Sequence, residues 1–157
     1  MIGQNYAEYA WEMTETLLSI DSPSGFTSRA ALWVKERFEA LGFSANLTAK
    51  GGVLIDLGGE KTDDALLLEA HADTLGAIVA GIKGNGRLRL SPLGGLNANN
   101  GEAENVWVYT RSGKVIDGTC QLCNASVHVN GEYSNAKRAF ETVEIVLDED
   151  VSSPDDV

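Results

Sequence analysis

A short apolar run at residues 65–68 leads directly to His71 and Asp73, and the character of the chain changes there. The run is far too short to span a membrane, and its continuous apolar character predicts a strand covered on both faces by helices. In open α/β sheets, ligands bind beyond the carboxyl ends of the strands, where His71 would lie. We therefore expect the chemistry of this chain around residues 69–73.

Side chains on one face of a strand recur at every second residue, so Glu69, His71 and Asp73 share a face if the strand continues. A histidine that binds a metal through one ring nitrogen usually donates its other N–H to a carboxylate, which fixes the tautomer. His71 and Asp73 would supply both groups. The alternative is a turn in which the aspartate caps the backbone and the histidine is solvated.

Two helices are expected before the apolar run. Asn5 and Glu8 have the spacing of a capping box, and apolar residues follow at helical spacing, which predicts one face packed on a core. A second helix is expected from about Thr27, with Gly42 at its C-terminal end. We interpret both helices as scaffold.

The remaining elements are predicted to be short strands separated by glycine-rich turns. Beyond Asp73 we find no further amphipathic helix. The expected strands other than the apolar run cover residues 43–47, 53–57, 75–82, 87–90, 106–110, 115–119 and 142–147. Short strands at this spacing are typical of a small barrel or sandwich. The chain is thus predicted to be α/β up to about Ala72 and all-β from Asp73 onward.

The charge balance excludes some classes of partner. The chain has 12 basic and 23 acidic residues, a net charge of −11, and no cluster of Lys or Arg. We therefore expect neither nucleic acid nor a membrane as partner. The first residues lack the basic and apolar segments of a signal peptide, so the expected location is cytoplasmic.

Cys120 and Cys123 form a single C-x-x-C motif. A structural zinc site needs four protein ligands, and His128 raises the nearby candidates only to three. A thioredoxin-type motif would begin a helix, whereas this pair lies in an expected β region. We predict two reduced thiols, with zinc or redox chemistry as the alternative.

Several segments follow the order found in one peptidase family. They are Leu-Ser-Ile-Asp-Ser-Pro-Ser-Gly at 18–25, the His-x-Asp segment at 66–76, Ile-Lys-Gly-Asn-Gly-Arg-Leu-Arg-Leu-Ser-Pro-Leu-Gly-Gly at 82–95, and residues 114–118. In these segments the chain resembles the glutamyl aminopeptidase, tetrahedral aminopeptidase and endoglucanase-M family of cocatalytic metallopeptidases. Residues 124–133 resemble a bacterial subfamily.

The resemblance implies a fold in two parts. Residues 1–72 would be the N-terminal part of a zinc-peptidase-like α/β catalytic domain. Residues 73–157 would be part of an inserted β-barrel-like oligomerisation domain. Members of the family form dimers or larger homo-oligomers, so a homo-oligomer is expected for the complete protein.

The resemblance also implies the chemistry. His71 would bind one of two divalent metal ions, which are zinc, cobalt or manganese, and Asp73 would be the catalytic carboxylate that orients His71. Family members use a metal-bridged water and a glutamate base to remove the N-terminal residue from peptide substrates. Glu69 is a candidate for support of the metal ligand. His128 is a candidate for the substrate cleft or a subunit interface.

Two departures from the family and two alternative functions accompany this prediction. Thr74 stands where many members have Glu, and Gly51-Gly52 where they have Gly-Asn. The family places the other metal ligands and the base beyond the inserted domain, so the 157-residue chain alone is expected to be inactive. The main alternative is a non-catalytic oligomerisation or binding module. Glycoside hydrolysis is a third hypothesis, for which no carboxylate pair is identifiable.

Overall fold

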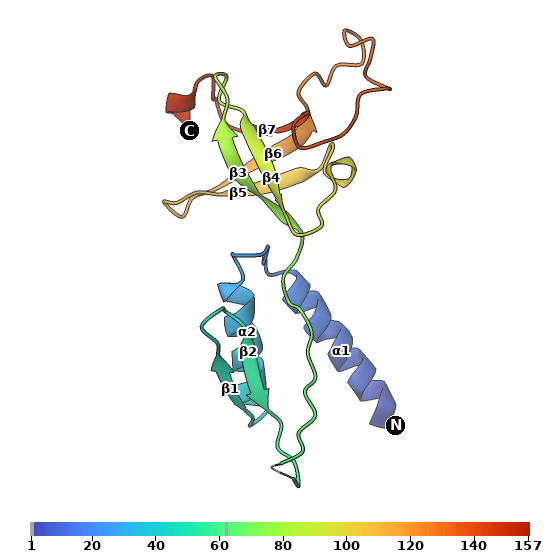
Figure 1. Cartoon of the computed structure of the whole chain (residues 1–157), viewed down its shortest axis with the longest axis vertical. Coiled ribbons are helices and arrows are strands. Elements are labelled where there is room, and N and C mark those ends of the chain that lie inside the picture. The colour runs from blue at the N-terminus through green and yellow to red at the C-terminus, as the bar shows by residue number, and fades with distance from the viewer. Residues whose placement is uncertain (1, 62) are drawn as a thin grey trace. The chain divides into compact units, whose positions relative to one another are not determined.

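The computed structural model describes residues 2–61 and 63–157, with side chains from Asn5 onward. The chain forms two compact units, residues 1–75 and residues 76–157 (Figure 1). None of the described helices is long and apolar enough to cross a membrane.

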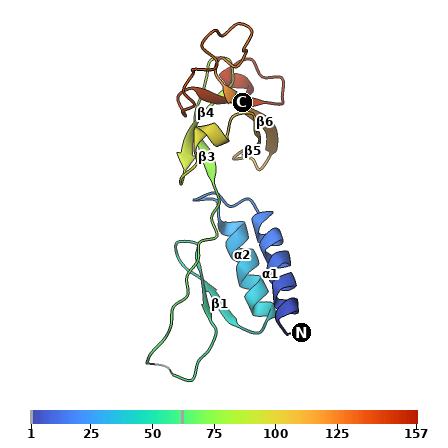
Figure 2. The same ribbon diagram turned by 90° about the vertical axis from the view of Figure 1, so that its right-hand side faces the viewer.

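The first unit contains two helices and a two-stranded hairpin. Helix α1 spans Ile2–Leu18 and helix α2 spans Ser28–Ala40, and the two lie side by side (Figure 2). Strands β1 (Ser44–Leu47) and β2 (Val53–Asp56) pair antiparallel. The second predicted helix and this hairpin are confirmed.

The ends of these helices follow from local backbone chemistry. Thr27 is the N-cap of α2, and Gly42, just beyond its end, has φ +90, a conformation that glycine adopts without strain. The predicted start of α1 at Asn5 is wrong, because the helix already includes Ile2 and places Asn5 in its interior. The expected apolar stripe is also largely unburied, since Trp11 is 76% exposed.

The prediction of a buried strand in the apolar run is wrong. Residues 65–73 are neither strand nor helix, and Leu66, Leu67 and Leu68 are 73–84% exposed. A strand exists only where a neighbouring strand receives its hydrogen bonds. Within the described ranges, the first such contact is a single parallel bridge between Thr74 and Pro23. The apolar pattern is therefore present without the neighbour that would convert it into a strand.

The second unit is a five-stranded antiparallel sheet with the order β3-β4-β7-β6-β5 (Figure 1). The strands are β3 (Gly76–Ile82), β4 (Leu88–Leu93), β5 (Asn105–Tyr109), β6 (Val115–Leu122) and β7 (Val143–Leu147). Two short 3-10 helices, Ala98–Asn100 and Pro154–Asp156, accompany them. All five strands expected after Asp73 are confirmed, within a few residues at their ends.

One apolar cluster holds this sheet together. Its buried members come from three of the strands and a 3-10 helix: Leu88, Ala98, Cys120, Leu122, Val143, Ile145 and Leu147. Strands β6 and β7 approach so closely at Gly118 that a Cβ there would lie 2.7 Å from the Val146 carbonyl oxygen. Any larger residue would push the strands apart.

A buried carboxylate fixes the turn between β3 and β4 to β7. Glu144 is 1% exposed and accepts hydrogen bonds of 2.5 Å from Lys83 Nζ and Arg87 Nη1, which flank that turn. Burial acts to raise the pKa of Glu144, but the hydrogen bonds from Lys83 and Arg87 outweigh it and lower the pKa. The negative charge of the buried Glu144 carboxylate is therefore balanced by the positive charges of Lys83 and Arg87.

Candidate active site

Two segments that are distant in sequence run side by side at the candidate site. The Ser22 hydroxyl donates to the Ala72 carbonyl oxygen (2.9 Å), and the Thr74 amide donates to the Ser22 carbonyl oxygen (2.9 Å). Ser22 is completely buried. These bonds fix the backbone on both sides of Asp73, so its side chain is held by the turn that follows α1.

The carboxylate of Asp73 is shared between two partners. Ser24 Oγ donates to Asp73 Oδ2 (2.5 Å), while Asp73 Oδ1 lies 3.2 Å from His71 Nδ1. The backbone carbonyl of Asp73 is also 3.1 Å from the same ring nitrogen. The hydrogen bond from Ser24 lowers the pKa of Asp73, and the charge interaction with His71 acts in the same direction. Asp73 is therefore an anion that orients the imidazole.

This geometry leaves one histidine nitrogen for a ligand. Because Nδ1 faces two acceptor oxygens, it carries the proton, and Nε2 is the nitrogen able to bind a metal ion. The His71 side chain is 86% exposed. Among the side chains described from Asn5 onward, no group of three or more His, Cys, Asp or Glu is placed to hold a metal. The geometry of His71 and Asp73 fits one metal ligand with its orienting carboxylate, and the metal-binding role of these residues stays a prediction.

Comparison with known proteins gives the family. The family model for M42 glutamyl aminopeptidase matches residues 51–157. This chain belongs to that family. It is 37% identical over 140 residues to the aminopeptidase-family protein YhfE of Bacillus subtilis. The aligned residues make up 89% of this chain and 40% of that relative.

Solved structures show the same fold. The TET aminopeptidase of a marine Thaumarchaeota archaeon superposes with a TM-score of 0.80 at 23% identity, over 96% of this M42 chain and 40% of that chain. PhTET1-12s, solved as a dodecamer, gives a TM-score of 0.75 at 20% identity, over 93% and 42%. The predicted fold class, α/β followed by a β-rich part, is confirmed. The M42 chain spans about 40% of the length of these relatives.

Glu69 stays a prediction. It lies in the extended segment before His71 and its side chain is exposed. Within the part of the M42 chain that the structure describes, no hydrogen bond or ion pair joins it to His71 or Asp73. Its carboxylate reaches solvent.

His128 lies in the second unit, in an exposed turn of the long connection between β6 and β7. That connection is anchored by Arg138, whose guanidinium donates to both oxygens of the Glu102 carboxylate (2.6 and 3.2 Å). Val129, beside the histidine, is 80% exposed. A fixed loop that presents an exposed histidine agrees with a cleft or interface role, which stays a prediction.

Cys120 and Cys123 of the M42 chain form no disulfide, and the prediction that they take no part in zinc or redox chemistry stays a prediction. Cys120 is buried on β6, and burial raises the pKa of its thiol. Cys123 is exposed just beyond the strand, with Lys83 Nζ at 3.5 Å from its sulfur.

The contribution of Ser22 and Ser24 is absent from the sequence prediction. The segment Asp-Ser-Pro-Ser-Gly has the composition of a helix stop, and it does follow the end of α1. The hydroxyl partners of Ala72 and Asp73 are 50 and 49 residues away in sequence, a separation that no local pattern detects. The sequence feature that could have pointed to Ser22 and Ser24 is their position in the family motif at residues 18–25.

Proposed function

We propose that this chain is part of a metallo-aminopeptidase that hydrolyses the N-terminal residue from peptides. Membership of the M42 family supports the reaction class. The observation that carries the proposal is the Asp73 carboxylate, which is held by Ser24 on one oxygen and faces His71 Nδ1 with the other. A solvated turn has no need for an imidazole with its tautomer fixed in this way.

In this proposal each residue has a defined task. Ser24 keeps Asp73 ionised and fixed, Asp73 holds the proton of His71 on Nδ1, and His71 presents Nε2 to a divalent metal ion. We propose two ions per site, of zinc, cobalt or manganese, because imidazole and carboxylate suit all three. When bound, such ions supply Lewis-acid activation of water and of the scissile carbonyl.

We extend the proposal to the organisation of the protein. Residues 1–72 would belong to the catalytic domain and residues 73–157 to an inserted oligomerisation domain. The dodecameric PhTET1-12s neighbour supports a homo-oligomer. Glu69 would support the metal ligand, His128 would face the cleft or a subunit interface, and the expected location is the cytoplasm.

The 157-residue chain alone is expected to have no peptidase activity, because its described side chains bring together too few metal ligands. Assays on aminoacyl anilides with zinc, cobalt or manganese test this, and turnover by the chain alone would place the site elsewhere. The separate buried core of the β unit favours one alternative, a non-catalytic oligomerisation or binding module.

The decisive experiment measures metal binding and activity together. In the complete gene product, His71→Ala should abolish hydrolysis of aminoacyl anilides and remove one metal equivalent. Asp73→Asn should weaken metal affinity by about 10 to 100-fold. Asp63→Asn, an exposed aspartate of the same unit, is the matched control and should leave both unchanged. Full activity of the His71 variant would refute the proposal.

A further inference from the structure

Strand β5 forms one open edge of the five-stranded sheet. In residues 76–157, all of which the structure describes, β5 pairs with β6 and with no other strand. Alternate N–H and C=O groups of an edge strand face away from its partner and are ready to receive another chain. The sequence of β5, Asn-Val-Trp-Val-Tyr, includes no proline or charged residue to block such pairing.

The outer face of this edge carries a large exposed aromatic side chain. Trp107 is 62% exposed, whereas its neighbours Val106 and Val108 pack against the core cluster. Asp117 on β6 is the direct cross-strand partner of Trp107. Residues opposed in this way have Cβ atoms about 5 Å apart, so the indole and the carboxylate lie within reach of one ligand.

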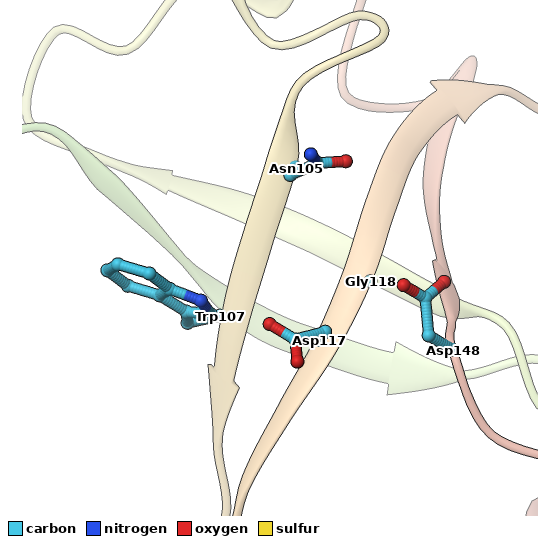
Figure 3. Close-up of a pocket in the computed structure, with 5 residues that line it drawn as sticks. All are labelled: Asn105, Trp107, Asp117, Gly118 and Asp148. Atoms are coloured by element: carbon cyan, nitrogen blue, oxygen red, sulfur yellow. The ribbon is translucent and has the colours of Figure 1, made fainter.

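A pocket of about 350 Å³ opens beside these two residues, lined by Asn105, Trp107, Asp117, Gly118 and Asp148. Figure 3 shows the indole beside β5 and the carboxylates of Asp117 and Asp148 in this view on either side of β6. The Asp148 amide donates to the Asp117 carbonyl oxygen (2.9 Å), which fixes the two acidic residues relative to each other.

The two carboxylates differ from others in this unit. Glu144, Glu102 and Glu149 each form an ion pair with a lysine or arginine. Asp117 and Asp148 have no such cation among the residues that the structure describes. Two unpaired carboxylates beside an exposed indole complement one chemical group, a cation attached to an apolar stem.

We propose that β5 and this pocket form a docking site for an extended peptide segment that carries a basic side chain. The segment would add to the sheet as a strand along β5. Its lysine or arginine would lie over the Trp107 indole and pair with Asp117 and Asp148. This site is independent of the peptidase function proposed above, since it uses no residue of the His71 site.

Charge favours a separate peptide over a second copy of the chain as occupant. A second copy paired along β5 would bring its own Asp117 and Asp148 to the same edge, so two pockets of like charge would meet there, whereas the homo-oligomer proposed above can form through other surfaces. A basic peptide has the opposite charge. Its association should therefore be fast at low salt and weaken as salt is added.

The test uses the full chain and two blocked pentapeptides of alternating valine and threonine, with arginine or glutamine at the central position. Binding is measured by tryptophan fluorescence and by amide NMR shifts. The arginine peptide should bind about tenfold more tightly than the glutamine peptide. The largest amide shifts should map to β5, and raising salt from about 50 to 500 mM should remove most of the difference.

Variants then separate the contribution of the two carboxylates to peptide affinity from that of the indole. The Asp117→Asn, Asp148→Asn double variant should lower affinity for the arginine peptide to that of the glutamine peptide, and Trp107→Ala should weaken both. Trp11→Ala and Asp155→Asn, at other exposed positions, are matched controls and should leave both affinities unchanged. The salt dependence of the unaltered chain gives the same answer if a variant fails to fold.

Three results would overturn the proposal. The first is equal affinity for the two peptides, or no binding of either. The second is a set of amide shifts centred on β3 and β4 in place of β5. The third is self-association of the chain that Trp107→Ala abolishes, because a second copy would then occupy the edge.

Discussion

The two units differ in how much apolar side chain they bury. In the β unit, seven residues of one cluster are buried, including Leu88 and Ile145 at 1–2% exposure. In the first unit, the buried apolar residues among those described are three alanines, Ala30, Ala31 and Ala45. Stability from burial scales with the apolar area removed from water, so most of it belongs to the β unit.

The polar contacts of the two units also differ in how deeply they are buried. In the β unit, a buried carboxylate is neutralised by two cations and ties a turn to the centre of the sheet. In the first unit, two serine hydroxyls position one half-exposed carboxylate. The first arrangement stabilises a fold, and the second holds a chemical group in place for a small gain in stability.

The largest expected effect comes from matched leucine truncations in the two units. Leu88→Ala in the β core should lower the free energy of unfolding by about 2–5 kcal/mol, because it leaves a cavity. Leu67→Ala, at a 73% exposed position, should change it by less than about 0.5 kcal/mol. Urea unfolding followed by amide NMR reports each unit separately. Equal losses would show that the two units do not differ in burial.

The next effect concerns the buried carboxylate. Glu144→Gln should cost about 1–3 kcal/mol in the β unit, because it leaves Lys83 and Arg87 without their anion. Glu149→Gln removes an exposed pair with Lys114 and should cost less than about 1 kcal/mol. Urea unfolding of both variants at neutral pH makes the comparison.

The pH dependence of unfolding sharpens this prediction. The pKa of Glu144 is lowered, so its stabilisation is present above its ordinary value of 4.5 and is lost as the pH falls through the lower folded-state pKa. The pKa of Lys83 is raised, mainly by its hydrogen bond to Glu144, so its stabilisation is fully present below its ordinary value of 10.5 and is lost as the pH rises through the higher folded-state pKa. Both losses should shrink in Glu144→Gln, and unchanged pH profiles would contradict this account.

The smallest effect on stability is expected at the candidate active site. Ser24→Ala removes the bond that lowers the pKa of Asp73, so that pKa should rise toward 3.8. Asp73 stabilises the first unit above pH 3.8 and loses that effect as the pH falls through its lowered pKa. Carboxyl NMR titration measures the change. Ser19→Ala is the control, and an unmoved Asp73 titration would contradict the role of Ser24.

The sequence predicts best those elements that local patterns determine. The five strands after Asp73 follow from period-two alternation between glycine turns, and Gly42 marks the end of α2. The strand at 65–68 fails because an apolar run has no strand geometry without a neighbour. The His71–Asp73 pair is visible because its members are adjacent in sequence.

Other parts of the two sites depend on contacts between distant residues. Ser24 reaches Asp73 across 49 residues, and Trp107 faces Asp117 only because of the β5–β6 register. Asp148 joins that pocket from the end of β7, a strand placed beside β6 by the fold. Such positions follow from topology, which composition and periodicity do not contain.

The bonds from Ser22 and Ser24 to residues 72 and 73 close a long loop in the chain. For a flexible loop of this length the closure entropy alone is about 3.5 kcal/mol, which is similar to what these bonds and the bond from the Thr74 amide to Ser22 return together. The closure costs less than this in the folded unit, because α2 and the β1–β2 hairpin lie inside the loop and shorten it by folding. The orientation of the imidazole is therefore set by residues 50 and 49 positions away in sequence as well as by its immediate neighbours.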